Sequence, residues 1–380
     1  MTRTEEAAAS IGDHSFARGD DGLVRVLDFD GVPLADATVP DIDDETFVGL
    51  YADMRAARRF DERAISLQRQ GRMGTYASLA GQEGSQVGST YALSDDDWLF
   101  YQYREHGTLF AREFPPEHLA YWMGHEAGNG AVADANVFPL NIGIASHLPH
   151  AVGWGMAAQY KGDESLSVAH FGEGSTSEGD FHEALNFAGV FDTATLFICH
   201  NNGWAISIPA EDQTASESFA MKAEAYGFPG IRVDGMDPLA AYQVTKAAAD
   251  VAHSPPEGRL RSTLIEMVEY RYGAHTTADD PTVYRDNATV EQWKQRDPIE
   301  RLEAFLRETG RLDDEMIASI ENEIDDEIAD LISVAESFEA DPADLFADMY
   351  ATQPAEIQSQ EAAFLDSIER HGKSAFLREE

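Results

Sequence analysis

The stretch Phe171–Phe181, "FGEGSTSEGDF", decides how we interpret this chain. It follows the strand-like run "SLSVAHF" and precedes the helix-like run "FHEALNFAGVF". Glycine-rich turns between a strand and a helix often bind phosphate, because the backbone can approach the anion and the helix N-terminus faces it. Here an acid, Glu173, lies between Gly172 and Gly174. A carboxylate repels phosphate unless a cation lies between them, so the turn points to a metal.

Apolar and helical segments alternate along most of the chain. From Glu45 to about Thr277, runs such as "TLFICHNN" and "STLIEMVEY" alternate with helical stretches such as "DPLAAYQVTKAAADVAH". This alternation predicts an α/β fold, with a mostly parallel sheet covered by helices on both faces. We expect an N-terminal arm over residues 1–44, the α/β domain over 45–289 and a helical region over 290–380, where apolar residues recur at helical spacing.

Composition and charge exclude several classes of protein. The 69 acids and 27 bases of this 380-residue chain give a formal net charge of −42, which disfavours nucleic acid and anionic membranes as partners. We interpret the charge as a halophilic surface, because concentrated salt screens the self-repulsion. The apolar runs are too short to span a membrane and the first residues lack a signal-peptide pattern, so we expect a cytoplasmic location. The single cysteine, Cys199, excludes a disulfide framework and is expected to be buried.

The turn fits neither of two common phosphate-binding motifs. The third glycine of a dinucleotide fingerprint is replaced by Ser177, and the next strand-like run ends in "CHNNG" instead of a ribose-binding acid. No Gly-Lys-Ser/Thr sequence follows, which excludes a P-loop. The two strand ends instead supply oxygen atoms from Glu173, Asn201 and Asn202. Magnesium prefers such ligands together with phosphates, so the sequence predicts a magnesium ion that bridges this turn to a diphosphate.

The same residues resemble a known motif. The Gly-Glu-Gly turn is followed by Asn-Asn, and Asn202 lies 29 positions after Glu173. This pair of segments is similar to the thiamine diphosphate motif. Further stretches, in chain order, are "QRQGRMGTYASLAGQEGSQVGS", "YQYREHG", "NNGWAISIP", "GIRVDGMDPLAAY" and "RYGAHTTADDPTVYR". Together they resemble the alpha subunit of the decarboxylating component of 2-oxo acid dehydrogenase complexes, of pyruvate or branched-chain type. The resemblance spans roughly Leu67 to Arg301 and implies the thiamine diphosphate-binding fold.

This resemblance implies a set of metal and diphosphate ligands. Glu173, the side chain of Asn202 and the main-chain carbonyl of Trp204 would bind magnesium. Tyr103 and Arg104 of "QYREHG" would hold the cofactor, Arg104 through its charge on the diphosphate. The residues of the turn that would line the cofactor are Gly172, Gly174 and Ser175.

Three further positions are implied around the reacting end of thiamine diphosphate. The backbone of Ile142 would contact the aminopyrimidine ring, and Ile144 would be the apolar wedge that bends the cofactor. His275 in "YGAHTT" matches the active-site histidine of the family, near the diphosphate and the reacting carbon.

The implied activity is oxidative decarboxylation of a 2-oxo acid with acyl transfer to a lipoyl group. Pyruvate is the favoured substrate, and a branched-chain 2-oxo acid or acetoin is the alternative. Such enzymes need a glutamate at the pyrimidine ring, normally from a second α/β domain, and 380 residues leave no room for one beside the first. The resemblance therefore implies a beta subunit, an α2β2 heterotetramer and a lipoyl-bearing acyltransferase as partners.

Three departures from the family pattern and two alternative functions stay open. Pyruvate-type members resemble one another in having aspartate at the position of Glu173, whereas branched-chain members have glutamate there, as this chain does. His200 stands where branched-chain members look to have an arginine. Thr276 and Thr277 stand where animal members carry regulatory serines.

Two alternative functions of the chain are a nicotinamide- or flavin-dependent oxidoreductase and a non-enzymatic acidic binding protein. Cofactor binding distinguishes the three functions. Magnesium-dependent binding of thiamine diphosphate supports the decarboxylating component, binding of NAD or FAD supports the oxidoreductase, and binding of no cofactor supports the binding protein.

Overall fold

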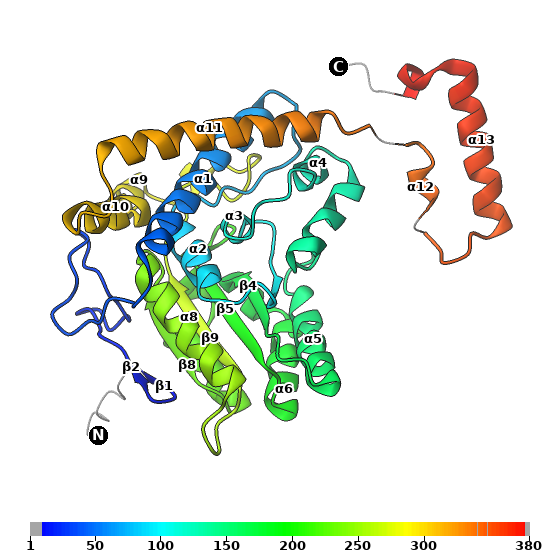
Figure 1. Cartoon of the computed structure of the whole chain (residues 1–380). Coiled ribbons are helices and arrows are strands. Elements are labelled where there is room, and N and C mark those ends of the chain that lie inside the picture. The colour runs from blue at the N-terminus through cyan, green and yellow to red at the C-terminus, as the bar shows by residue number, and fades with distance from the viewer. Residues whose placement is uncertain (1–9, 340, 348, 377–380) are drawn as a thin grey trace. The chain divides into compact units, whose positions relative to one another are not determined.

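The computed structural model describes residues 10–339, 341–347 and 349–376, which divide into two compact units between Ala335 and Glu336. The first unit is built on a five-stranded sheet of order β3-β4-β5-β9-β8, in which all neighbouring strands are parallel (Figure 1). The strands are β3 (Trp98–Phe100), β4 (Ser167–Gly172), β5 (Thr195–Asn201), β8 (Gly230–Asp234) and β9 (Thr263–Val268). The predicted α/β class with a parallel sheet is confirmed.

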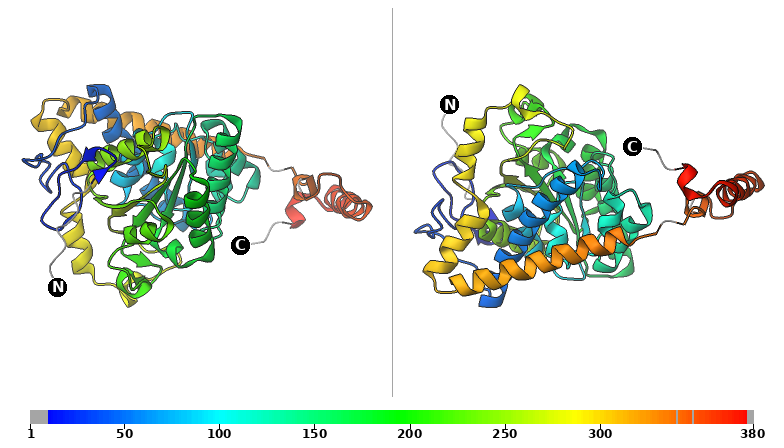
Figure 2. Two further views of the ribbon diagram at one scale, coloured as in Figure 1. Left: turned by 90° about the horizontal axis from the view of Figure 1, so that it is seen from below. Right: turned by 90° about the horizontal axis from the view of Figure 1, so that it is seen from above.

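Helices cover both faces of the sheet, as Figures 1 and 2 show. Ala169 and Phe171 of β4 belong to a core cluster shared with α5 (His147–Lys161) and α6 (Gly179–Phe191). Successive side chains of a strand point to opposite faces, so Val168 and His170 face the other way. That second face is covered by α8 (Pro238–His253), against which α2 (Glu83–Tyr91) packs. Both faces are therefore buried, which explains why the strands are almost continuously apolar.

The N-terminal segment is attached along β8. Val24 forms a parallel bridge with Val233, and Arg25 donates to Asp234 at 2.7 Å. Asp237 caps α8 and also accepts hydrogen bonds from the main-chain N–H groups of residues 26 and 27. One buried carboxylate thus begins the helix and holds the arm. The antiparallel two-residue pairs outside the main sheet are β1 (Ser10–Ile11) with β2 (His14–Ser15), and β6 (Trp204–Ala205) with β7 (Ile208–Pro209).

Two long helices pack beside each other on the first unit. Asp43 caps α1 (Asp44–Arg69) by accepting from the main-chain N–H of Thr46 at 2.8 Å. Arg55 of α1 pairs with Glu321 of α11 (Asp314–Glu336). The remaining helices of this unit are α3 (Gly107–Phe110), α4 (His118–Trp122), α7 (Ala210–Gln213), α9 (Asn287–Lys294) and α10 (Pro298–Glu308). Its 3₁₀ helices are η1 (Glu126–Ala135), η2 (Glu173–Ser177), η3 (Ala220–Tyr226) and η4 (Pro281–Val283).

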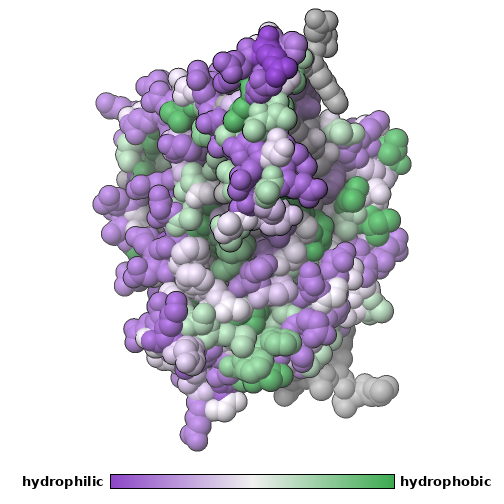
Figure 3. Space-filling view, turned by 90° about the vertical axis from the view of Figure 1, so that its right-hand side faces the viewer, coloured by the Kyte–Doolittle hydropathy of each residue, from purple (hydrophilic) through white to green (hydrophobic). Residues whose placement is uncertain are grey.

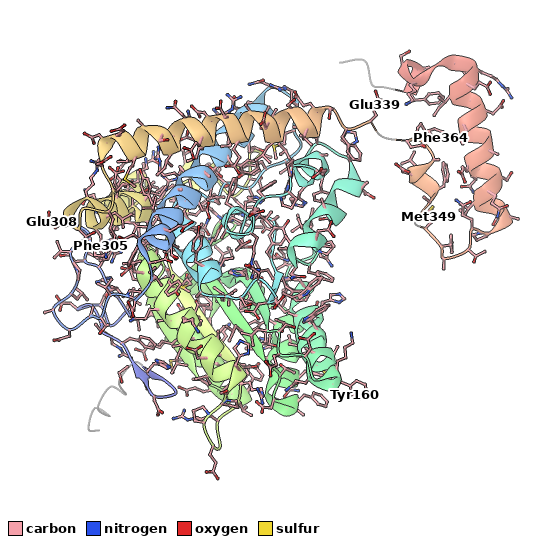
Figure 4. The ribbon with its side chains drawn as sticks, viewed as in Figure 1. Tyr160, Phe305, Glu308, Glu339, Met349 and Phe364 are labelled. Atoms are coloured by element: carbon pink, nitrogen blue, oxygen red, sulfur yellow. The ribbon has the colours of Figure 1, made fainter. Side chains whose placement is uncertain are left out.

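The described elements of the C-terminal unit are all helices, as predicted for the C-terminal tail. It contains α12 (Asp344–Ala347), α13 (Ala355–His371) and η5 (Lys373–Phe376). Phe364, labelled in Figure 4, lies between Phe346 and Phe376, with ring centroids 5.9 and 5.7 Å away. The division into 1–44, 45–289 and 290–380 as domains stays a prediction.

The surface carries the acids. Hydrophilic residues cover most of the face shown in Figure 3, and acids such as Glu323, Asp326 and Asp330 of α11 are exposed. Cys199 is buried in β5, as expected. Within the described ranges, none of the helices has the length and apolar character needed to cross a membrane.

Candidate active site

A pocket of about 290 Å³ lies where the chain leaves the carboxyl ends of β4 and β5. Ten residues predicted to form the site line it, namely Tyr103, Arg104, Ile144, Gly172, Glu173, Gly174, Ser175, Asn202, Trp204 and His275. Ile142 is not among the lining residues, and its side chain is 55% exposed. The structure thus brings together nearly all the predicted residues from segments far apart in the chain, while the role of each stays a prediction.

Glu173 follows β4 directly and begins η2. Its side chain is buried, with hydrogen bonds of 3.4 Å from the main-chain N–H of Asn202 and from Nε2 of Gln213. No lysine or arginine among the described residues forms an ion pair with it. Burial raises the pKa of the Glu173 carboxyl. A buried carboxylate that lacks a cationic partner is costly, and a bound cation would offset that cost.

Asn202 and Trp204 follow β5 and complete a set of oxygen donors. Asn202 is buried, and its Oδ1 accepts from the main-chain N–H of Trp204 at 3.3 Å. Gly203 between them has a φ of 87°, which glycine adopts without strain. The described residues contain no group of three or more His, Cys, Asp or Glu able to hold a metal. A metal here would therefore combine Glu173 with amide and main-chain oxygens, a donor set that fits magnesium.

His275 lies between two arginines. Arg104 donates to the His275 carbonyl at 2.9 Å and faces its Nδ1 at 3.0 Å, and Arg271 faces the same Nδ1 at 3.3 Å. Because a guanidinium only donates, Nδ1 accepts, and the neutral ring carries its proton on Nε2. Burial, together with the charges of Arg104 and Arg271, lowers the pKa of His275 to about 4. The ring is therefore a neutral hydrogen-bond donor at physiological pH.

The loop after His275 is held by its own hydrogen bonds. Asp279 accepts from the His275 main-chain N–H at 2.7 Å and from the Tyr284 hydroxyl at 2.5 Å. Arg271 in turn donates to that hydroxyl at 3.1 Å. The main-chain N–H of Thr277 donates to the Tyr76 carbonyl at 3.0 Å. These contacts fix the position of His275 relative to the pocket.

His200 is buried behind the pocket and does not line it. Its Nε2 lies 3.0 Å from Nδ1 of His170, and its Nδ1 lies 3.0 Å from Oγ of Ser85 and 3.3 Å from Oε1 of Glu269. Burial lowers the pKa of His200 to about 4 and raises the pKa of Glu269 well above its usual value. Burial thus disfavours the charged forms of both groups, so this network offers no strong cation toward the pocket, whereas Arg104 lines the pocket itself.

Several lining residues were missed by the sequence reasoning, namely Gln102, Glu105, Glu178, Ala205 and Ile206. Gln102 and Glu105 flank Tyr103 and Arg104 in "QYRE". Their adjacency to these two predicted site residues was the signal that could have identified them. Ile206 has a φ of 58°, which β-branched residues rarely adopt, and its carbonyl accepts from Arg271 at 2.9 Å. That strain could be found only in the structure.

Comparisons with known proteins agree with this geometry. A family model described as "Dehydrogenase E1 component" matches residues 51–343. The chain is 42% identical over 343 residues to "3-methyl-2-oxobutanoate dehydrogenase subunit alpha" of Mycobacterium tuberculosis, covering 89% of this chain and 92% of that protein. It is 41% identical over 292 residues to "Pyruvate dehydrogenase E1 component subunit alpha" of Staphylococcus aureus, covering 76% and 77% respectively. The resemblance stated from the sequence is confirmed, and the chain belongs to the dehydrogenase E1 component family.

Proposed function

We propose that this chain is the alpha subunit of a 2-oxo acid dehydrogenase decarboxylating component and that it binds thiamine diphosphate through magnesium in this pocket. The observation that carries the proposal is the buried Glu173, which forms no ion pair among the described residues and lines the pocket together with Asn202 and Trp204. Thiamine diphosphate, when bound, supplies the chemistry that removes carbon dioxide from a 2-oxo acid.

The chain's own residues bind and orient the reactants. Arg104 is the positively charged residue that lines the pocket, and it would hold the diphosphate. Ile144 and Ile206 line the pocket with apolar side chains, which would pack against the rings of the bound cofactor. His275 offers the proton on Nε2 as a hydrogen-bond donor, because its Nδ1 is occupied by two guanidinium groups.

The substrate prediction is supported at the level of 2-oxo acids. Relatives named for 3-methyl-2-oxobutanoate and for pyruvate are similar to this chain at 42% and 41% identity. Pyruvate is the substrate favoured from the sequence. A branched-chain 2-oxo acid is the second candidate, favoured by the lining residues Ile144 and Ile206 and by the glutamate at position 173. A panel of pyruvate, 3-methyl-2-oxobutanoate and acetoin, tested on the chain co-purified with its beta subunit, distinguishes them by kcat/KM.

The partners are proposed from the same relationship. Both relatives are named as alpha subunits, which supports a beta subunit, an α2β2 assembly and a lipoyl-bearing acyltransferase as partners.

The Glu173→Gln variant tests the metal site. The amide keeps the volume of the side chain but removes the charge, so we expect magnesium-dependent binding of thiamine diphosphate to weaken by about 10- to 100-fold or more. Isothermal titration calorimetry measures the affinity, and circular dichroism checks that the fold is intact. Asn202→Ala should weaken binding in the same way. Unchanged affinity in both variants would remove these residues from the site.

A further inference from the structure

Gln82 lies directly behind the proposed metal ligand Asn202. It is fully buried at the start of α2, and its Oε1 accepts from Nδ2 of Asn202 at 3.1 Å. Gln82 occupies the N-cap position of α2, yet its side chain makes no capping hydrogen bond, and glutamine is not a preferred cap. Its amide therefore contributes to the Asn202 contact and not to the start of the helix.

The direction of both amide groups follows from one main-chain carbonyl. The Leu79 carbonyl can only accept, so Gln82 presents Nε2 to it, at 3.4 Å. Oε1 of Gln82 is then left for Asn202, which must present Nδ2 in return. The Oδ1 of Asn202 consequently faces the turn after β5, where it accepts from the main-chain N–H of Trp204. This order of donors does not depend on how amide oxygen and nitrogen are assigned.

The carbonyl that sets this order is itself fixed. Asp61 of α1 is buried and accepts from the Leu79 main-chain N–H at 2.7 Å. The same carboxylate accepts from the hydroxyls of Tyr76 and Ser78 at 3.0 and 2.7 Å. The main-chain N–H of Gln82 also donates to the Leu79 carbonyl, at 2.9 Å. A continuous set of hydrogen bonds thus runs from α1 to the Asn202 amide.

We infer that Gln82 is a positioning residue, which holds the oxygen of the Asn202 amide toward the bound metal and its nitrogen away from it. The inference rests on the proposed function, in which Asn202 binds magnesium. Without the acceptor on Gln82, the buried Nδ2 of Asn202 has no partner, which is costly. An amide that is no longer held by Gln82 can reorient, and any reorientation that moves Oδ1 away from the turn after β5 would remove one metal ligand. Loss of such supporting residues typically weakens metal binding by about 10- to 100-fold.

The test measures magnesium affinity in the full chain co-purified with its beta subunit. Magnesium chloride is titrated at saturating thiamine diphosphate and followed by tryptophan fluorescence, since Trp204 lines the pocket. Gln82→Met removes the acceptor at similar volume, and we expect the Kd for magnesium to rise about 10- to 100-fold. Gln82→Glu keeps an acceptor oxygen and is expected to restore most of the affinity. Thr90→Val is the matched control, because Thr90 is buried in the same helix and its hydroxyl donates to the Gln86 carbonyl at 2.8 Å, away from the metal turn.

The outcomes separate this inference from the proposed function. A magnesium Kd for Gln82→Met within about twofold of the wild-type value would overturn the positioning role, whatever the change in thermal stability. If the wild type requires magnesium and Asn202→Ala loses its magnesium affinity while Gln82→Met keeps it, only this inference is wrong. If the wild type binds thiamine diphosphate equally without magnesium, the proposed function and the inference fall together.

Discussion

Replacing His275 by alanine is expected to lower overall turnover by ~10²–10⁴-fold while affecting thiamine diphosphate affinity much less. The ring lies in the pocket, and both arginines that face it bind its Nδ1, so the proton on Nε2 is free to act on the substrate side. Reductive acylation of a lipoyl acceptor and cofactor affinity are measured separately. His253→Ala changes an exposed histidine at the end of α8 and is the control. Full turnover in His275→Ala would remove this residue from the active site.

The pH dependence gives a second readout for the same residue. A folded-state pKa of about 4 for His275 lies below its ordinary value of 6.5, because burial and two neighbouring cations disfavour the charged ring. The ring is therefore neutral throughout the physiological range and becomes protonated only as the pH falls toward 4. We expect kcat to show no ionisation of His275 near pH 6.5. A histidine resonance assigned to His275 that titrates near pH 6.5 in NMR spectra would contradict this assignment.

The general position of the site could be predicted because the two side chains proposed as metal ligands, an acid and an amide, each directly follow a strand. Parallel strands end at the same edge of a sheet, so Glu173 after β4 and Asn202 after β5 had to lie close together. The alternation of apolar and helical segments likewise predicted the sheet and its two helical layers. Local sequence is sufficient for such features, because each depends on one strand and the turn that follows it.

Other features depend on packing between distant segments and could not be predicted. Gln82 reaches Asn202 only because the start of α2 packs against the end of β5, 120 positions away in the chain. Arg271 donates hydrogen bonds to two main-chain carbonyls of the turn, those of Trp204 and Ile206. These bonds hold Ile206 at a positive φ that its β-branched side chain disfavours. Residue type alone argued against that conformation.

His200 shows the same limit. Strand alternation places it on the opposite face from Cys199, but the partner on that face was not visible in the sequence. The partners are His170, Ser85 and Glu269, from segments on either side of β5 in the chain. The sequence therefore left the role of His200 open, because the buried network that its ring faces depends on packing between distant segments.

Purified alone with magnesium and thiamine diphosphate, this chain is expected to show no decarboxylation of 2-oxo acids. The main sheet of the described residues is a single five-stranded parallel sheet, and the acids that line its pocket are Glu105, Glu178 and the proposed metal ligand Glu173. The glutamate for the pyrimidine ring is proposed to come from a beta subunit. Activity should therefore appear only with the co-purified beta subunit, measured as release of carbon dioxide from pyruvate and 3-methyl-2-oxobutanoate. Robust turnover by the lone chain would overturn the half-site argument.

Assembly with the beta subunit is expected to strengthen as salt rises, because an α2β2 assembly brings together two copies of this chain, each with a net charge of −42 whose repulsion must be screened. The Debye length falls from about 10 Å at ~0.1 M salt to about 3 Å at ~1 M, so repulsion between exposed acids decreases steeply over this range. Analytical ultracentrifugation of the pair across a salt series measures the effect. Neutralising three exposed acids of α11 together, by Glu323→Gln, Asp326→Asn and Asp330→Asn, should lower the salt concentration needed. A pair that is most stable in dilute buffer would contradict the halophilic interpretation, since repulsion among uncompensated acids is strongest there.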